Sequence, residues 1–119
     1  MAKKILIIDD DAELCEEMAE FLNDEGYSVQ TALDGNQGEK LIRKNNYDVI
    51  LLDFKMPGLN GIDMLKIVKE KKPKPAVFII SGRPFIEKLL EEENLTSVVD
   101  GIMGKPFDLE MMLKRIRSL

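Results

Sequence analysis

The sequence predicts one α/β domain, residues 1–119, in which helices cover both faces of a parallel five-stranded sheet. Near-continuous apolar runs at 5–8, 49–52 and 76–80 have the length and composition of strands buried on both sides. Segments with apolar residues at helical spacing follow these runs, so that strand and helix alternate five times with short connections. Such alternation is typical of parallel sheets with right-handed crossovers, and 119 residues suffice for a single core.

The first half of the chain supplies two strands and two helices before the central strand. The strand 4–8 runs into three aspartates, of which Asp11 is expected to cap a helix that Gly26 ends. Alternation over 27–32 predicts an edge strand with one wetter face. Asp34-Gly35 predicts a turn, and a short polar helix ends near 45–46.

The second half begins with the strand 49–53, which ends on Asp53. A helix then runs out in a lysine-rich end, which we interpret as a solvated helix terminus: Lys69, Lys71, Lys72 and Lys74. The strand 76–80, a helix starting near Pro84 and a weak strand over 98–103 come next. Asp108 is expected to cap the last helix. Met111 and Met112 in that helix are candidates for a surface that docks a partner protein.

Five strands in this pattern most often adopt the flavodoxin-like, doubly wound order 2-1-3-4-5. In that order the first and third strands are neighbours, which places Asp9 and Asp10 beside Asp53. The carboxyl ends of the strands are where open α/β sheets bind their ligands. Asp53, at the end of the central strand, is therefore the first candidate for function.

Composition excludes several classes of function. A net charge of −5 and a pI near 4.8 argue against direct nucleic-acid binding. No apolar run is long enough to span a membrane, and no signal peptide is recognisable. The single cysteine, Cys15, cannot form an internal disulfide, which favours a cytoplasmic location. The chain has no histidine, so histidine-based catalysis and typical zinc sites are excluded.

The predicted site combines five side chains at the strand ends. Three clustered carboxylates, Asp9, Asp10 and Asp53, repel one another and require a cation, for which oxygen ligands favour Mg²⁺ or Mn²⁺. Ser81 and Lys105 arrive from the ends of the fourth and fifth strands. A carboxylate nucleophile, a divalent ion, a hydroxyl and an ammonium are suited to phosphoryl transfer.

The chain resembles the receiver domains of two-component response regulators along essentially its whole length. The matching motifs, in order at the strand ends, are Ile8-Asp9-Asp10, Leu51-Leu52-Asp53 with Met56-Pro57-Gly58 and Asn60-Gly61, Ser81-Gly82, and Lys105-Pro106-Phe107. The resemblance implies that Asp53 accepts a phosphoryl group from a sensor histidine kinase or a histidine phosphotransfer protein. It also implies a downstream protein partner, and no enzymatic activity beyond the domain's own phosphorylation and dephosphorylation.

The resemblance further implies a role for each site residue. Asp10 would bind Mg²⁺ directly, Asp9 largely through water, and the backbone carbonyl of Lys55 would add a ligand. Ser81 would hydrogen-bond the phosphoryl group, and Lys105 would pair with it and precede a cis peptide bond to Pro106.

Two features depart from the family pattern. Ile102 stands where the family usually has an aromatic or histidine switch residue. Ser81 and Lys105 are 24 positions apart, which is longer than usual and suggests extra residues after the fourth helix.

Lys55 and Arg83, each two residues beyond a site residue, are candidates for controlling the lifetime of the phosphoryl group.

Several alternatives stay open at the level of sequence. The chain could be a stand-alone receiver or one excised from a longer regulator or hybrid kinase. A degenerate receiver used only for binding is suggested by Ile102. A small aspartyl phosphohydrolase is a third reading, although such enzymes usually carry an acid where this chain has Lys55.

Overall fold

The computed structural model describes residues 3–54, 61–82, 86–104 and 108–119. Five parallel strands form one sheet in the order β2-β1-β3-β4-β5, which confirms the predicted flavodoxin-like topology. The strands are β1 (Lys4–Ile8), β2 (Ser28–Ala32), β3 (Val49–Asp53), β4 (Ala76–Ser81) and β5 (Gly101–Gly104). The helices are α1 (Ala12–Asp24), α2 (Gly35–Lys44), α3 (Gly61–Lys69), α4 (Ile86–Glu92) and α5 (Leu109–Arg117).

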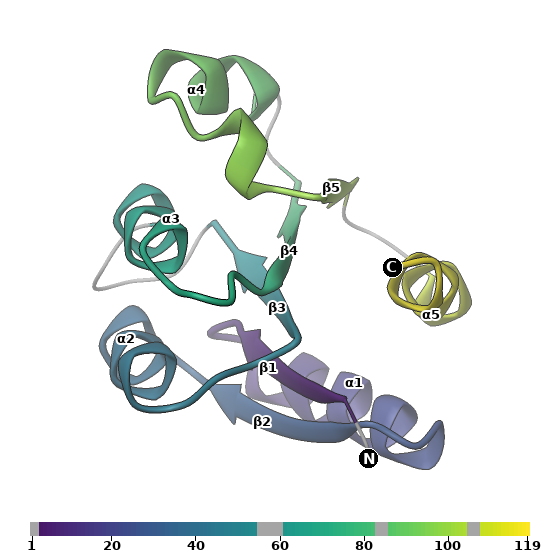
Figure 1. The fold of residues 1–119 in the computed structure, drawn as a ribbon. Coiled ribbons are helices and arrows are strands. Elements are labelled where there is room, and N and C mark those ends of the chain that lie inside the picture. The colour runs from purple at the N-terminus through teal and green to yellow at the C-terminus, as the bar shows by residue number, and fades with distance from the viewer. Residues whose placement is uncertain (1–2, 55–60, 83–85, 105–107) are drawn as a thin grey trace.

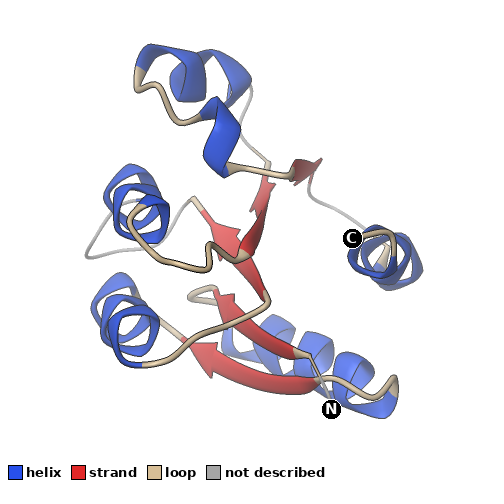
Figure 2. Cartoon of the chain, in the orientation of Figure 1, coloured by secondary structure: helices blue, strands red, loops and turns tan. Residues whose placement is uncertain are grey.

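The helices lie on both faces of the sheet, with α1 and α5 on one side and α2, α3 and α4 on the other (Figure 1, Figure 2). Each side has its own apolar core. The alternating side chains of the strands fill the two cores in turn: Ile7 and Leu51 face α1 and α5, while Ile8 and Leu52 face the other helices. Because β3 is covered on both faces, all five of its residues are buried.

Helix ends follow the capping chemistry of the sequence. The Asp11 carboxylate accepts a hydrogen bond from the Leu14 backbone N–H, and Asp108 accepts one from Glu110, as predicted. Asp34 does more than make a turn, because its carboxylate caps α2 by accepting from the Gln37 N–H. After α1 the backbone of Gly26 has φ +97°, a conformation in which glycine is favoured.

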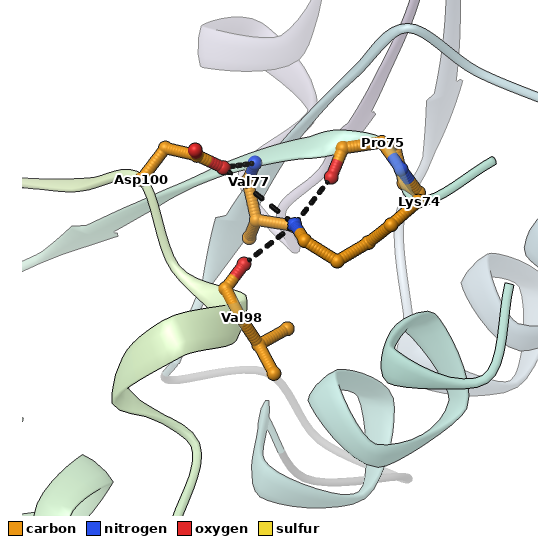
Figure 3. Close-up of polar contacts among 5 residues, drawn as sticks. All are labelled: Lys74, Pro75, Val77, Val98 and Asp100. Atoms are coloured by element: carbon orange, nitrogen blue, oxygen red, sulfur yellow. Dashed lines mark hydrogen bonds and ion pairs between the residues drawn. The ribbon is translucent and has the colours of Figure 1, made fainter. Parts of the chain in front are cut away.

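The connection from α4 to β5 differs from the prediction of a strand over 98–103. A short 3₁₀ helix, η1 (Thr96–Val98), precedes the strand, and β5 begins only at Gly101. Lys74 Nζ ties this connection to the start of β4, donating to the carbonyls of Pro75 at 2.7 Å and Val98 at 2.9 Å (Figure 3). It also lies 3.7 Å from the Asp100 carboxylate.

Two of the four clustered lysines are therefore not simply solvated. Lys74 makes the contacts just described, and Lys71 Nζ donates to the Asn45 carbonyl at 3.1 Å. That bond joins the end of α3 to the end of α2.

Nowhere in the described part of the chain is there a helix with the length and apolar character needed to cross a bilayer.

Candidate functional site

The acidic cluster forms at the carboxyl edge of the sheet, as the strand order requires. Asp53 is the last residue of β3, and Asp9 follows β1 directly. Since Ile8 pairs with Leu52 in the sheet, Asp9 and Asp53 lie next to each other, and Asp10 follows. One carboxylate oxygen from each of Asp9, Asp10 and Asp53 lies within 4.8 Å of the other two.

Local contacts fix the Asp9 segment. The Asp9 N–H donates to the Ala32 carbonyl at 3.0 Å, which continues the pairing of β1 with β2 beyond the strand. The Asp9 carboxylate accepts the N–H of Asp11 at 3.0 Å, so the turn into α1 is held by the same side chain. Asp9 and Asp53 are only 1% and 2% exposed, whereas Asp10 reaches the solvent.

Ser81 enters the same edge from β4. Asp53 pairs with Ile80 in the sheet, and Ser81 is the next residue along, 3% exposed. Beyond Asp53, the ring of Phe54 packs on the first residue of α3: a Cβ atom on Gly61 would overlap that ring. Glycine at this position therefore lets α3 begin in contact with the residue that follows Asp53.

The donor set of the cluster fits a hard divalent cation. At an effective dielectric constant near 20, two carboxylate charges 4.8 Å apart repel by roughly 3 kcal/mol. A cation held among the three oxygens would remove this repulsion, and all-oxygen sites suit Mg²⁺ or Mn²⁺. Of the three aspartates, only Asp10 is exposed to solvent.

Cys15 packs directly behind the cluster. Its thiol is 2% exposed and donates a hydrogen bond to the Asp9 carbonyl, with Sγ 3.3 Å from the oxygen. Burial, reinforced by the charges of Asp9, Asp11 and Asp10, raises the pKa of the Cys15 thiol to about 11. The contact between Cys15 and Asp9 was not predicted, because apolar spacing along a helix indicates burial and not a particular partner.

We expect Cys15 to be chemically inert in the folded protein. At pH 8, iodoacetamide should modify it far more slowly in buffer than in concentrated urea, because the thiol is buried and protonated. The raised pKa also predicts that the contribution of Cys15 to stability is constant below pH 9, the ordinary pKa of the thiol, and is lost as the pH rises from 9 through about 11. Urea midpoints measured across this range should decline less steeply for Cys15→Ala, and equal slopes would contradict the assignment.

The other residues that the sequence singled out lie away from the acidic cluster or outside the described part of the chain. Ile102, in β5, is half-buried and packs against the core on the side of α3 and α4. Met111 is 56% exposed and so accessible to a partner protein. Met112 is fully buried, and the expectation that Met112 belongs to a docking surface was wrong. Lys55, Arg83, Lys105 and the Lys105-Pro106 bond lie outside the described residues.

Comparison with known proteins identifies the family. The model of the response regulator receiver domain matches residues 5–117, and the chain belongs to this family. Receiver domains in general accept a phosphoryl group, and they interact with histidine kinases and phosphotransfer proteins. The uncharacterized transcriptional regulatory protein YcbL of Bacillus subtilis is 32% identical over 95% of this chain and 49% of its own length. The chain thus spans about half of the curated relatives it matches.

Solved receiver structures share the fold over nearly the whole chain. A Francisella response regulator receiver domain is 33% identical, with a TM-score of 0.84, over 98% of this chain and 94% of its own. The response regulator TrrA of Thermotoga maritima, solved in complex with Mg²⁺-BeF, is 25% identical with a TM-score of 0.81. That alignment covers 98% of this chain and 97% of TrrA.

Proposed function

We propose that this chain is a Mg²⁺-dependent receiver in which Asp53 accepts the phosphoryl group of a histidine–aspartate phosphorelay. The observation that carries the proposal is the convergence of Asp9, Asp10 and Asp53 within 4.8 Å at the end of the central strands. Family membership supports phosphoryl acceptance in general, and the complex of TrrA with Mg²⁺-BeF supports a metal-assisted site in a related receiver. A kinase or phosphotransfer histidine is the proposed donor.

Each site residue has its own role in the proposed phosphoryl transfer. A carboxylate oxygen of Asp53 attacks the phosphorus of the donor, an O–P bond forms, and the bond from phosphorus to the donor nitrogen breaks. The donor imidazole leaves with the electron pair. Asp9 and Asp10 would hold Mg²⁺, with the Lys55 carbonyl as a further ligand, and the bound ion would neutralise charge on the phosphoryl oxygens. Ser81 would donate a hydrogen bond to those oxygens, and Lys105 would pair with them.

Burial of Asp53 suits this role. The carboxylate is almost fully shielded from bulk water, which strengthens its electrostatic interaction with a bound cation. Phosphorylation would exchange a singly charged buried side chain for a more strongly charged one at the junction of β3 with the segment toward α3. A change of contacts with a partner protein is the proposed output.

Acetyl phosphate tests the proposal without a cognate kinase. Intact mass measured after incubation with acetyl phosphate and Mg²⁺ should show one added phosphoryl group per chain, and excess EDTA should abolish the gain. Base or hydroxylamine should remove the group, as expected of an acyl phosphate. Absence of any gain under all conditions, with no thermal stabilisation by Mg²⁺, would leave a receiver used only for binding. Steady turnover of phosphate esters would instead indicate a phosphohydrolase.

A further inference from the structure

Charge is strongly segregated along this chain. Residues 5–39 contain eleven acidic residues and no lysine or arginine, whereas residues 40–74 contain nine basic residues and four acidic ones. The net charge of −5 is therefore the sum over regions of opposite charge, of which 5–39 is acidic and 40–74 is basic. The fold determines where these regions meet the solvent.

The acidic region is concentrated on α1. Five exposed side chains form what is here called the acidic stripe: Glu13, Glu16, Glu17, Glu20 and Asp24. Each of them has another member of the stripe three or four residues away along the helix. Like charges at these spacings repel within a helix and destabilise it. In the described part of the chain, no ion pair neutralises any member of the stripe; the neighbouring Glu25 does pair with Arg117.

The basic region lies on the opposite side of the sheet. Lys40 and Lys44 of α2, Lys69 of α3 and Lys72 just after it, here called the basic surface, are all exposed. Other cations nearby are paired: Arg43 with Glu39, Lys66 with Glu93. The four lysines of the basic surface have no such ion pair among the described residues.

The two surfaces are complementary in place as well as in charge. Because α1 and α2 cover opposite faces of the sheet, the acidic stripe and the basic surface of one molecule can each be contacted by a different neighbour (Figure 1). The bond from Lys71 to Asn45 holds the ends of α2 and α3 together, so the basic surface extends across two helices. Lys40 and Lys44, with Gln37, Leu41 and Arg43, also border a shallow hollow.

We propose that the basic surface docks the acidic stripe of a second copy of this chain. A second copy is favoured as the occupant because the chain itself carries the complementary acidic stripe. That stripe has no ion pair among the described residues, and it lies on the opposite face of the sheet from the basic surface. The contact joins two different surfaces, so it extends molecules head to tail, into an open row or a closed ring, and does not form a symmetric dimer. Its strength depends on exposed charges, and salt therefore weakens it.

Sedimentation velocity of the 119-residue chain tests the proposal. At about 10 mM salt, where the screening length is about 30 Å, the sedimentation coefficient should rise with protein concentration. At about 0.15 M salt, with a screening length of about 8 Å, the rise should shrink or vanish. The variant Lys40→Glu/Lys44→Glu should stay monomeric in both buffers, and so should Glu17→Lys/Glu20→Lys.

Two controls separate the docking surfaces from net charge. Lys88→Glu/Lys114→Glu changes the net charge as much as Lys40→Glu/Lys44→Glu does, at exposed positions on α4 and α5, and should associate like the wild type. An equimolar mixture of Lys40→Glu/Lys44→Glu with Glu17→Lys/Glu20→Lys should associate again. A wild type that is monomeric at low salt overturns the proposal. So does a control pair that suppresses association as fully as the α2 pair, or a mixture that stays monomeric.

Discussion

Asp53→Asn is expected to gain no phosphoryl group from acetyl phosphate in the presence of Mg²⁺. The substitution keeps the size of the side chain, but a neutral amide is a far weaker nucleophile than a carboxylate and a poorer partner for a divalent ion. Since Asp53 is 2% exposed and lies at the end of the fully buried strand β3, the amide should occupy the same place. Intact mass spectrometry measures the outcome directly.

Asp48→Asn provides the matched control. Asp48 immediately precedes the same strand at its opposite end, where its exposed carboxylate accepts a hydrogen bond from the Lys4 N–H. This variant should be phosphorylated to the same extent as the wild type. Phosphorylation of Asp53→Asn at the wild-type level, with the label mapped to another acid, would remove Asp53 from its proposed role while leaving the family assignment intact.

Leu51→Ala is expected to lower the free energy of unfolding by about 3 kcal/mol or more. Leu51 is fully buried in the core between the sheet and the helices α1 and α5, on a strand flanked by Ile7 of β1 and Phe78 of β4. Truncation therefore removes buried apolar surface and leaves a cavity that β1 and β4, hydrogen-bonded on either side, cannot readily fill. Urea denaturation followed by circular dichroism measures the loss.

The same substitution at an exposed leucine separates burial from residue type. Leu33 is 43% exposed, and its backbone N–H, which donates to the Gln37 side chain, is retained in alanine. Leu33→Ala should change the unfolding free energy by less than about 1 kcal/mol. Similar losses for the two variants would mean that Leu51 lies in a region able to collapse around the missing atoms.

Much of the fold was predictable because β1, β3 and β4 are buried on both faces. That burial demands unbroken apolar runs, and the runs mark the strands. The adjacency of Asp9 and Asp53 then followed from the strand order alone. The strand β5 was harder to delimit, because four residues with a glycine at each end carry little apolar signal.

Other features had no signal in the sequence. Lys74 bonds two backbone carbonyls, which are present at every residue and so cannot be recognised from residue types. The contact of Cys15 with the Asp9 carbonyl escapes prediction for the same reason. Ser81 was expected at this edge because it ends the fourth strand, and it is buried there beside Asp53. Its role toward the phosphoryl group is implied only by the family motif and stays a prediction. The roles of Lys55, Arg83 and Lys105 stay predictions, because these residues lie outside the described part of the chain.

The burial of Cys15 has a practical consequence for fluorescence and spin-label work. The chain has one cysteine and no tryptophan, and the cysteine is shielded from reagents. A cysteine introduced at an exposed position such as Met111 would therefore be the sole thiol open to a dye, with the natural thiol left in place. Distances between labels on neighbouring molecules could then be followed in a protein whose acidic cluster has not been altered.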